Sequence, residues 1–345
     1  MDDALSNLLH GVRPEGALFD RSALLPPWSL RFAQGTPLAL LTVLSGEAWV
    51  MSDGHTPVRL TPCDVAIVTG PEPYTVADDP GTPPLARYDG VECTVLGPDG
   101  HPATTPAEAA RAAAMCLAPD TAPDLSGAVP GPRPPGLADP ADHADPAGTG
   151  TVLLKGVYRV RGSVSDRVLS ALPRIALLPA VPEGCMPLEM IAQELRRNVP
   201  GQQVVLDRLL DLLLVTSLRE WFALPGSGAP AWYRAHTDPL VGHALRLMHG
   251  DPAHPWTVAS LAGAAGASRA RFAHRFTELV GRSPMAYLTE WRICWAADLL
   301  ARTDSTVDAV SRQVGYSNAY ALSVAFKRIR GVRPSEHRAL ARTGA

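Results

Sequence analysis

The sequence predicts an α+β protein in which an N-terminal β-barrel is followed by an all-α part with two helix-turn-helix units. Two observations support this prediction. Between Leu24 and Ala77, short apolar runs alternate with turn residues at the regular spacing of a β-barrel or sandwich. Beyond residue 200, apolar residues recur three and four positions apart, which is the period of helices that bury one face.

Length and composition favour a soluble globular protein of two or three domains. The chain has 345 residues, of which 46% are hydrophobic and 19% charged. It contains no run of 18 apolar residues, and it starts with the acidic segment MDDALSNLLHGVRPEG, which lacks a signal sequence. The five cysteines are scattered and include no CxxC pair, unlike a secreted disulfide framework. We therefore expect a cytoplasmic protein that has no membrane partner.

The expected strands lie in the first half of the chain. The apolar runs are SLRF, PLALLTVLSG, EAWVMSDG, TPVRLTP, DVAIVTGP and YTVA. A segment at about 97–150 is so rich in Pro, Gly, Ala and Asp that we expect a disordered insertion there. The run TVLLKGVYRV at 151–160 indicates that the sheet resumes after the insertion.

Helices are predicted next, in the runs VLSALPRIALL, PLEMIAQELRR and VVLDRLLDLLLVTSLREWF. The third run has more apolar side chains than one buried stripe accommodates, so a second helix from this chain or another must cover it. These side chains are Val205, Leu209, Leu212, Leu213 and Leu218. The Pro- and Gly-rich linker PGSGAPAW follows at 225–232.

The charges are distributed unevenly along the chain. Residues 238–345 contain 14 Lys and Arg against 8 Asp and Glu, a net charge of +6, whereas residues 1–237 contain 17 against 26, a net charge of −9. A basic C-terminal third on an acidic body suggests a module that binds a polyanion.

The basic third contains a first helix-turn-helix pattern between Leu261 and Phe276. Gly266 marks a tight turn between two helices, and Ser268 is a suitable N-cap for the second helix. Phe272 and Phe276 share the packing face of that helix, so its polar face is directed outward.

A second pattern of the same kind occupies Val307 to Phe326. Gly315 stands at its turn, with Ser317 or Asn318 as the N-cap. Between the two patterns, Pro284 starts a helix of about 17 residues, roughly 25 Å long. Because successive major grooves of B-DNA lie about 34 Å apart, one chain could occupy two adjacent grooves.

These motifs resemble the DNA-binding domain of AraC-type (AraC/XylS) transcription regulators. The resemblance rests on WTVASLAGAAGASRARFAHRFTELVGRSPMAYLTEWRICWAADLL and on VDAVSRQVGYSNAYALSVAFKRIRGVRPSEHR. The second segment carries the Gly-aromatic-Ser turn of the family, its Phe-Lys-Arg and its Gly-x-x-Pro-x-x-x-Arg ending. The resemblance implies a sequence-specific DNA-binding transcription regulator without enzymatic activity, and double-stranded DNA as its partner.

The resemblance also assigns residues by position. Base-reading positions fall on Ala270, Ala273, His274, Asn318, Tyr320, Ser323 and Val324, with Ser317 on the same outward face. Phosphate contacts are expected from Arg269, Arg271, Arg275, Lys327, Arg328 and Arg330. Because Val324 and the alanines offer no hydrogen bonds to bases, we expect phosphate contacts to supply most of the affinity.

The segment before the insertion resembles a cupin sensor domain. Gly35, Glu47 and Gly54 fall in register with the first cupin motif, but Leu41 and Val43 occupy the places of its histidines. In the second motif, Cys63 replaces a glycine and Tyr74 replaces the last histidine. Three of the four metal ligands are therefore missing, and we expect neither a metal nor another cofactor.

The mouth of this cupin-like barrel is a candidate small-molecule site, because an apolar lining with one or two polar groups is typical of ligand pockets. The expected lining residues are Leu41, Val43, Glu47, Trp49 and Tyr74. The alternative is that the barrel serves only as a dimer scaffold.

The predicted domains are a sensor at 1–200, a helical connector with its linker at 201–236, and a DNA-binding domain at 237–345. The connector helix would pair two chains into a homodimer or pack within one chain. We expect an activator that responds to an unknown small molecule and contacts RNA polymerase. The alternatives are a cupin-type enzyme with a DNA-anchoring tail, and a redox sensor in which Cys63 pairs with Cys93.

Three histidines, His243, His249 and His254, lie close together in the sequence. Separations of six and five residues do not align on one helical face, which argues against a metal site. We expect these histidines at the surface.

Overall fold

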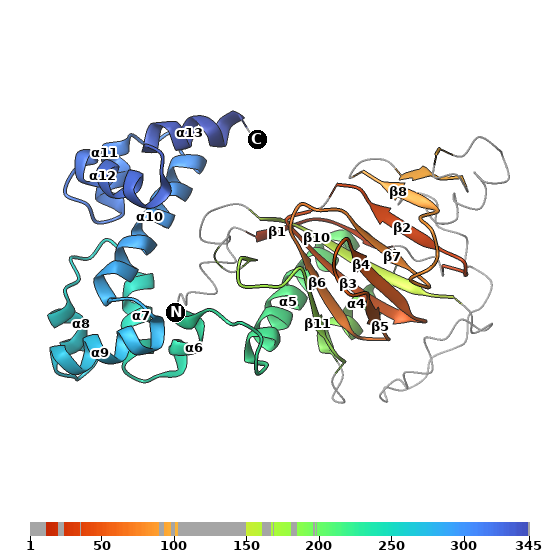
Figure 1. Cartoon of the computed structure of the whole chain (residues 1–345), viewed down its shortest axis with the longest axis horizontal. Coiled ribbons are helices and arrows are strands. Elements are labelled where there is room, and N and C mark those ends of the chain that lie inside the picture. Colours follow the sequence, from red (N-terminus) through yellow and green to blue (C-terminus); the bar gives the residue numbers. More distant parts are fainter. Residues whose placement is uncertain are drawn as a thin grey trace. The chain divides into compact units, whose positions relative to one another are not determined.

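The structure is a computed structural model, and it describes residues 12–19, 24–34, 36–89, 93–97, 101–102, 150–160, 167, 169–180, 185–195, 197 and 199–343. It consists of two compact units, which are described separately (Figure 1). The β unit comprises residues 14–159 and 173–221, and the helical unit comprises residues 1–13, 160–172 and 222–345. The insertion expected at about 97–150 lies outside the described residues, apart from its ends.

The β unit contains two sheets in its described residues. One sheet has the strand order β1-β10-β3-β6-β11, and the other has the order β5-β4-β7-β2-β8-β9. The strands are β1 (Val12–Phe19), β2 (Ser29–Phe32), β3 (Leu38–Ser45), β4 (Ala48–Ser52), β5 (Val58–Leu60), β6 (Val65–Thr69), β7 (Tyr74–Ala77), β8 (Ala86–Tyr88), β9 (Cys93–Val95), β10 (Val152–Val160) and β11 (Ile175–Leu178). The α+β class is therefore confirmed, with the strands in two sheets rather than one closed barrel.

Alternation along the strands builds the core of the β unit. Successive side chains point to opposite faces of a sheet, so Leu41 and Val43 of β3 share one face. They belong to a buried cluster that also contains Val50 and Val76 of the other sheet and Leu153 of β10. The inner faces of the two sheets therefore form one hydrophobic core.

The predicted helix over VLSALPRIALL is wrong at its C-terminal end, because IALL forms strand β11. This strand pairs antiparallel with β6, and Ile175 lies opposite Val68. Ile175 and Leu177 pack against the core cluster, while Ala176 and Leu178 are also buried. A short run that is apolar on both faces has no period that distinguishes a strand from a helix.

Two helices complete the β unit, α4 (Met186–Leu195) and α5 (Gln202–Ala223). The hydroxyl of Tyr158 on β10 donates a hydrogen bond of 2.8 Å to the backbone oxygen of Leu210 on α5. Leucines on that face of α5 are buried within the chain: Leu206, Leu209, Leu210, Leu213, Leu214 and Leu218. Val204, Val205 and Leu212 stay exposed, so this chain covers only part of the apolar surface of α5.

The helical unit consists of short helices around one long helix. They are α6 (Ala231–Arg234), η2 (Ala235–Thr237), α7 (Val241–Gly250), α8 (Val258–Ala264), α9 (Arg269–Val280), α10 (Pro284–Arg302), α11 (Val307–Gln313), α12 (Ala319–Arg330) and α13 (Pro334–Thr343). Across the described ranges of both units, we find no helix with the length and apolar character of a membrane span.

The two helix-turn-helix units repeat one local design. Helices of 7 and 12 residues, α8 and α9, are followed by α11 and α12 with the same lengths. In both turns a glycine with positive φ, Gly266 or Gly315, follows the first helix. The second helix ends in both units at a left-handed glycine, Gly281 or Gly331. The expected doubled motif is therefore present, with equivalent positions of α9 and α12 50 residues apart.

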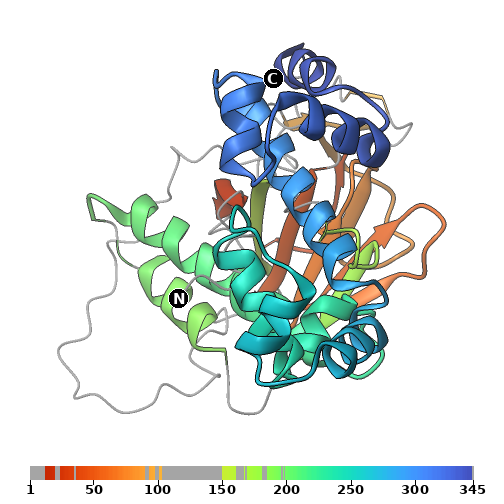
Figure 2. The same cartoon turned by 90° about the vertical axis from the view of Figure 1, so that its left-hand side faces the viewer.

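Helix α10 connects the two helix-turn-helix units. Ser283 caps it and Pro284 stands at its start, as the sequence predicts. Its 19 residues correspond to about 28 Å. The C-terminal half of α10 shares a buried cluster with α11 and α12, which includes Ile293, Leu300 and Phe326. Figures 1 and 2 show α8 with α9 at one end of α10 and α11 with α12 at the other.

His249 is not at the surface, contrary to the prediction. It is only 3% exposed, and its Nε2 lies 2.8 Å from the hydroxyl of Tyr287. Its ring centroid also lies 4.2 Å from that of Trp291. The Tyr287 hydroxyl and the aromatic neighbours suit a histidine in a core, so His249 joins α7 to α10.

Candidate nucleic-acid interface

Helix α9 is oriented by its buried face. The Ser268 hydroxyl caps the helix by accepting a hydrogen bond from the Arg271 N–H. Phe272 and Phe276 are fully buried, and their rings pack together at 5.7 Å. The opposite face is therefore turned to solvent. Exposed residues on it are Arg269, Ala270, Arg271 and His274, whereas Ala273 and Arg275 are half-buried.

Helix α12 also has one buried face and one exposed face, but its exposed side chains differ from those of α9. Asn318 is its N-cap, because the side-chain oxygen accepts a 2.9 Å hydrogen bond from the Ala321 N–H. The Ser323 hydroxyl donates to the Ala319 carbonyl within the helix. Tyr320 and Val324 are 77% and 54% exposed. Ser317, Asn318, Lys327 and Arg328 are exposed too, and Ser323 and Arg330 are half-buried.

Arg275 differs from the other predicted phosphate contacts because it is held by carboxylates. Its Nη2 lies 2.9 Å from Oδ2 of Asp238, and its Nη1 lies 3.0 Å from Oε2 of Glu278. The other oxygen of Asp238 accepts hydrogen bonds from the N–H groups of Leu240 and Val241 at the start of α7. Burial by itself would raise the pKa of Asp238, but these hydrogen bonds hold it below its ordinary value. Arg275 therefore joins α9 to the start of α7.

Four other cations on these faces have no carboxylate partner among the described residues. They are Arg269, Arg271, Lys327 and Arg328. Charges of this kind can neutralise phosphates without first breaking an ion pair. The two exposed faces thus combine free cations with small, polar or apolar side chains.

Arg292 fixes the position of one helix-turn-helix unit against the other. From the middle of α10, its Nε donates to the Pro252 carbonyl at 2.6 Å and its Nη2 donates to the His254 carbonyl at 2.8 Å, just before α8. The same loop packs against the second turn, since a Cβ on Gly315 would lie 2.6 Å from the Ala253 carbonyl oxygen. Sequence analysis did not identify Asp238 or Arg292, because each has a partner distant in sequence: the Arg275 side chain for Asp238, and the carbonyls of Pro252 and His254 for Arg292.

The expected ligand-site residues of the β unit lie in different places. Leu41, Val43 and Tyr74 are buried together in the core cluster. Trp49 is half-buried and follows the fully buried Ala48, so it points to the opposite face of β4. Glu47 forms an exposed ion pair with Arg59 at 2.6 Å.

These residues do not fit the metal that cupin enzymes hold. Leu41 and Val43 carry no donor atoms, and the only carboxylate of the set, Glu47, is engaged by Arg59 at the surface. Among the described residues, no group of three His, Cys, Asp or Glu side chains could hold a metal ion.

Lys155 was not identified from the sequence, although it lies within the same core. It is 4% exposed, on β10 opposite Leu41. Its Nζ lies 3.5 Å from the ring centroid of Phe32 and 5.1 Å from that of Tyr88. Burial disfavours the ammonium form and lowers the pKa of Lys155 to about 7. The aromatic rings are its cation–π partners.

The proposed pairing of Cys63 with Cys93 is wrong. Cys93 is disulfide-bonded, whereas Cys63 is a free thiol. Burial also raises the pKa of the Cys63 thiol, which makes the reactive thiolate scarce. Cys63 has a φ of 70°, a left-handed conformation that explains why the cupin motif has glycine there.

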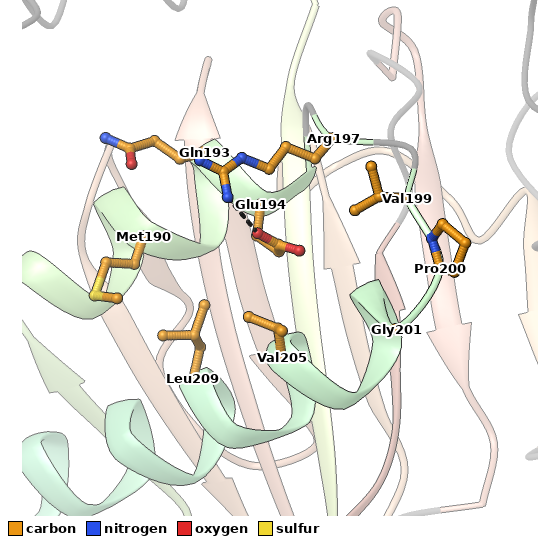
Figure 3. A pocket seen from close by; sticks show the side chains of 9 residues that line it. All are labelled: Met190, Gln193, Glu194, Arg197, Val199, Pro200, Gly201, Val205 and Leu209. Carbon is orange, nitrogen blue, oxygen red and sulfur yellow. Dashed lines mark ion pairs between the residues drawn. The ribbon is translucent and has the colours of Figure 1, made fainter.

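A pocket of about 460 Å³ opens between α4 and α5 (Figure 3). Its walls are mainly apolar, and Glu194 forms a 3.6 Å ion pair with Arg197 at its edge. The lining residues are Met190, Gln193, Glu194, Arg197, Val199, Pro200, Gly201, Val205 and Leu209. The pocket is continuous with the exposed apolar residues of α5.

Two helix-turn-helix units on one stiff helix, with outward cations, define a DNA-binding protein as a class. Comparison with known proteins agrees. A family model described as "Cupin" matches residues 3–223, and one described as "Helix-turn-helix domain" matches residues 261–339. The chain belongs to the AraC-like transcription regulators that carry an N-terminal cupin domain. It is a DNA-binding transcription regulator.

Two regulators and one solved structure are similar to this chain. A putative AraC-like transcription regulator of Streptomyces antibioticus is 34% identical over 66% of this chain and 75% of its own length. A second one, from Streptomyces lividans, is 29% identical over 90% of both chains. The solved DNA-binding domain of AdpA, in complex with a target DNA, is 32% identical and covers 31% of this chain and 96% of its own, with a TM-score of 0.30.

Proposed function

We propose that this regulator binds DNA in a sequence-specific way by placing α9 and α12 in two successive major grooves. The proposed contacts are Arg269, Ala270, Arg271, Ala273, His274, Arg275, Ser317, Asn318, Tyr320, Ser323, Val324, Lys327 and Arg328. The doubled helix-turn-helix on one α10 helix is the observation that carries the proposal. None of the proposed contact residues is buried.

Footprinting tests this proposal directly. Fragments selected from random DNA by the full chain should show two protected segments about one helical turn apart. Arg271→Ala should weaken the protection at one segment and Lys327→Ala that at the other, while Arg219→Ala, exposed on α5 of the β unit, should change neither. A single protected segment that responds to both substitutions would refute the two-groove arrangement.

A homodimer through α5 is the second part of the proposal. Val204, Val205 and Leu212 are exposed on α5, as are Met186 and Met190 on α4. Met190 and Val205 line the pocket between the two helices, and a second copy would cover these exposed apolar side chains. Leu212→Glu should yield monomers in light-scattering measurements, whereas Glu220→Gln should leave the dimer intact. Monomers in the unmodified protein would contradict this part.

The regulator is further proposed to act in the cytoplasm as an activator that responds to a small molecule and contacts RNA polymerase. Its effector would bind the β unit beside the core residues Leu41, Val43 and Tyr74; Lys155 lies opposite Leu41 and 5.8 Å from the Tyr74 ring centroid. The relatives are named as transcription regulators, which supports a role without catalysis. Transcription in vitro with purified polymerase tests activation. A decrease in transcript on adding the protein would indicate a repressor.

A further inference from the structure

We infer that α12 recognises thymine through the C5-methyl groups that project into the major groove, with Tyr320 and Val324 as the residues that contact them. This inference rests on the proposed placement of α12 in a major groove and adds the class of base that it reads.

Two apolar side chains lie on the exposed face of α12 that is proposed to face the bases of the major groove. Tyr320 and Val324 are four residues apart, so they lie one helical turn apart on the same face. They are 77% and 54% exposed, in the first half of the helix. Lys327 and Arg328 follow on the exposed surface, suitably placed for phosphates. Phosphate contacts next to this pair would hold it against base edges.

Two nearby polar residues, Asn318 and Ser323, form hydrogen bonds within the helix. The side-chain oxygen of Asn318 caps the helix through the Ala321 N–H, which uses one of its two lone pairs and holds the amide against the helix end. The Ser323 hydroxyl donates its hydrogen to the Ala319 carbonyl. Besides the hydroxyls of Tyr320 and Ser317, this face therefore offers to bases the apolar atoms of Tyr320 and Val324.

The equivalent positions of α9 differ in chemistry. With the 50-residue offset of the repeat, Ala270 corresponds to Tyr320, and His274 corresponds to Val324. His274 can exchange hydrogen bonds with a base edge, and Val324 cannot. The two recognition helices thus read different chemical groups, so the two parts of the operator differ in sequence.

Thymine is the base that suits an apolar contact. In the major groove, guanine, adenine and cytosine present hydrogen-bonding groups, whereas thymine also presents a methyl group. A tyrosine ring and a valine side chain bury that methyl group and gain the hydrophobic free energy of its removal from water. The inference therefore predicts one or two thymines in the segment bound by α12.

Replacement of single thymines by deoxyuridine tests the inference, because deoxyuridine keeps the hydrogen-bonding pattern and lacks only the methyl group. Each thymine of the footprint is replaced in turn, and the dissociation constant for the full chain is measured. At one or two positions in the α12 segment, affinity should fall about fourfold, as expected for one buried methyl group. No loss at any thymine of a clear footprint would overturn the inference.

Variants then connect the lost affinity to the residues. The Val324→Ser variant should bind equally well to DNA with thymine or deoxyuridine at the base that Val324 contacts. The Tyr320→Ala variant should do so at the base that Tyr320 contacts. Val324→Thr keeps one methyl group and should retain part of the preference. His274→Ser, the matched change on α9, should leave the deoxyuridine effect unchanged.

The alternatives give distinct results. If the deoxyuridine effect persists in both α12 variants, other residues read the methyl groups and the assignment is wrong. If Val324→Ser leaves DNA affinity unchanged and lowers transcription, the apolar pair contacts a protein and the inference fails. The absence of any footprint would instead refute the proposed function itself.

Discussion

Replacement of Lys155 by methionine should stabilise the β unit in a way that depends on pH. Lys155 is a buried amine in the core of the β unit, with aromatic rings beside it, and its burial lowers its pKa. In the unfolded chain its pKa is near 10.5, and in the folded chain it is about 7. Between these values the unfolded chain binds more protons, so stability rises with pH across that window.

The size of the effect follows from the same values. A difference of three to four pKa units at about 1.4 kcal/mol each corresponds to about 5 kcal/mol. The contact with the Phe32 ring returns about 1–2 kcal/mol to the ammonium form. Below pH 7, where the ammonium form is buried, Lys155→Met should therefore stabilise the β unit by about 3 kcal/mol. The gain should shrink between pH 7 and pH 10.5 and be smallest above that range, where the amine is neutral in both states.

Urea denaturation of the full chain between pH 6 and pH 10 measures this effect, with circular dichroism in the region of β structure as the probe. The unmodified protein should gain stability as the pH rises, and the Lys155→Met variant should show little change. Lys327→Met, on the exposed face of α12, is the matched control and should follow the unmodified protein. A variant that is less stable than the unmodified protein at pH 6 would show that Lys155 has a buried anionic partner.

Three further outcomes are expected. Lys327→Ala should weaken binding to all DNA sequences alike and lower the salt slope of log K by about 0.9, and a loss confined to one operator base would contradict this. Gly266→Ala should lower the free energy of unfolding by about 1–2 kcal/mol, because alanine is strained in a left-handed backbone conformation. Gly315→Ala should lower it by more than 3 kcal/mol in thermal unfolding, because only at Gly315 would the new Cβ meet neighbouring backbone atoms. Equal losses for the two variants would refute the argument. Asp238→Asn should destabilise the helical unit by about 1 kcal/mol at pH 7. In the unmodified protein, the stability that comes from the lowered pKa of Asp238 is lost as the pH falls below about 4, and the variant should not show this loss. An unchanged dependence of stability on acid pH would contradict the prediction.

Local sequence patterns predicted most of the fold. Strands with one buried face and helices with buried stripes have distinct periods, and the caps at Ser268 and Ser283 mark helix starts. The β11 strand was not predicted, because its four apolar residues carry no period and its pairing partner β6 lies about a hundred residues away. Hydrophobic periodicity therefore predicts long helices and strands with one solvated face better than it predicts short buried strands.

The candidate site was less predictable than the fold, since the role of a side chain depends on what surrounds it. From sequence, Arg275 is one of several exposed arginines, but in the structure Asp238 and Glu278 engage it. Asn318 is a base-reading candidate by position, yet the helix uses its oxygen as a cap. Lys155 belongs to an ordinary β-branched run, and only the pairing of β10 with β3 places it inside the core.

The proposed two-groove binding also implies how one chain would discriminate a site of two parts. A stiff α10 sets the distance between α9 and α12, and Arg292 ties the loop before α8 to the same helix beside the turn at Gly315. With the spacing fixed in this way, each recognition helix contributes its own base preference, and a DNA site must satisfy both at one separation. Under the proposed contacts, His274 and Val324 differ in chemistry at equivalent positions, so the proposed site would be asymmetric and binding would have a direction along the duplex. A regulator that contacts RNA polymerase needs such a direction, because the polymerase transcribes to one side of its promoter only.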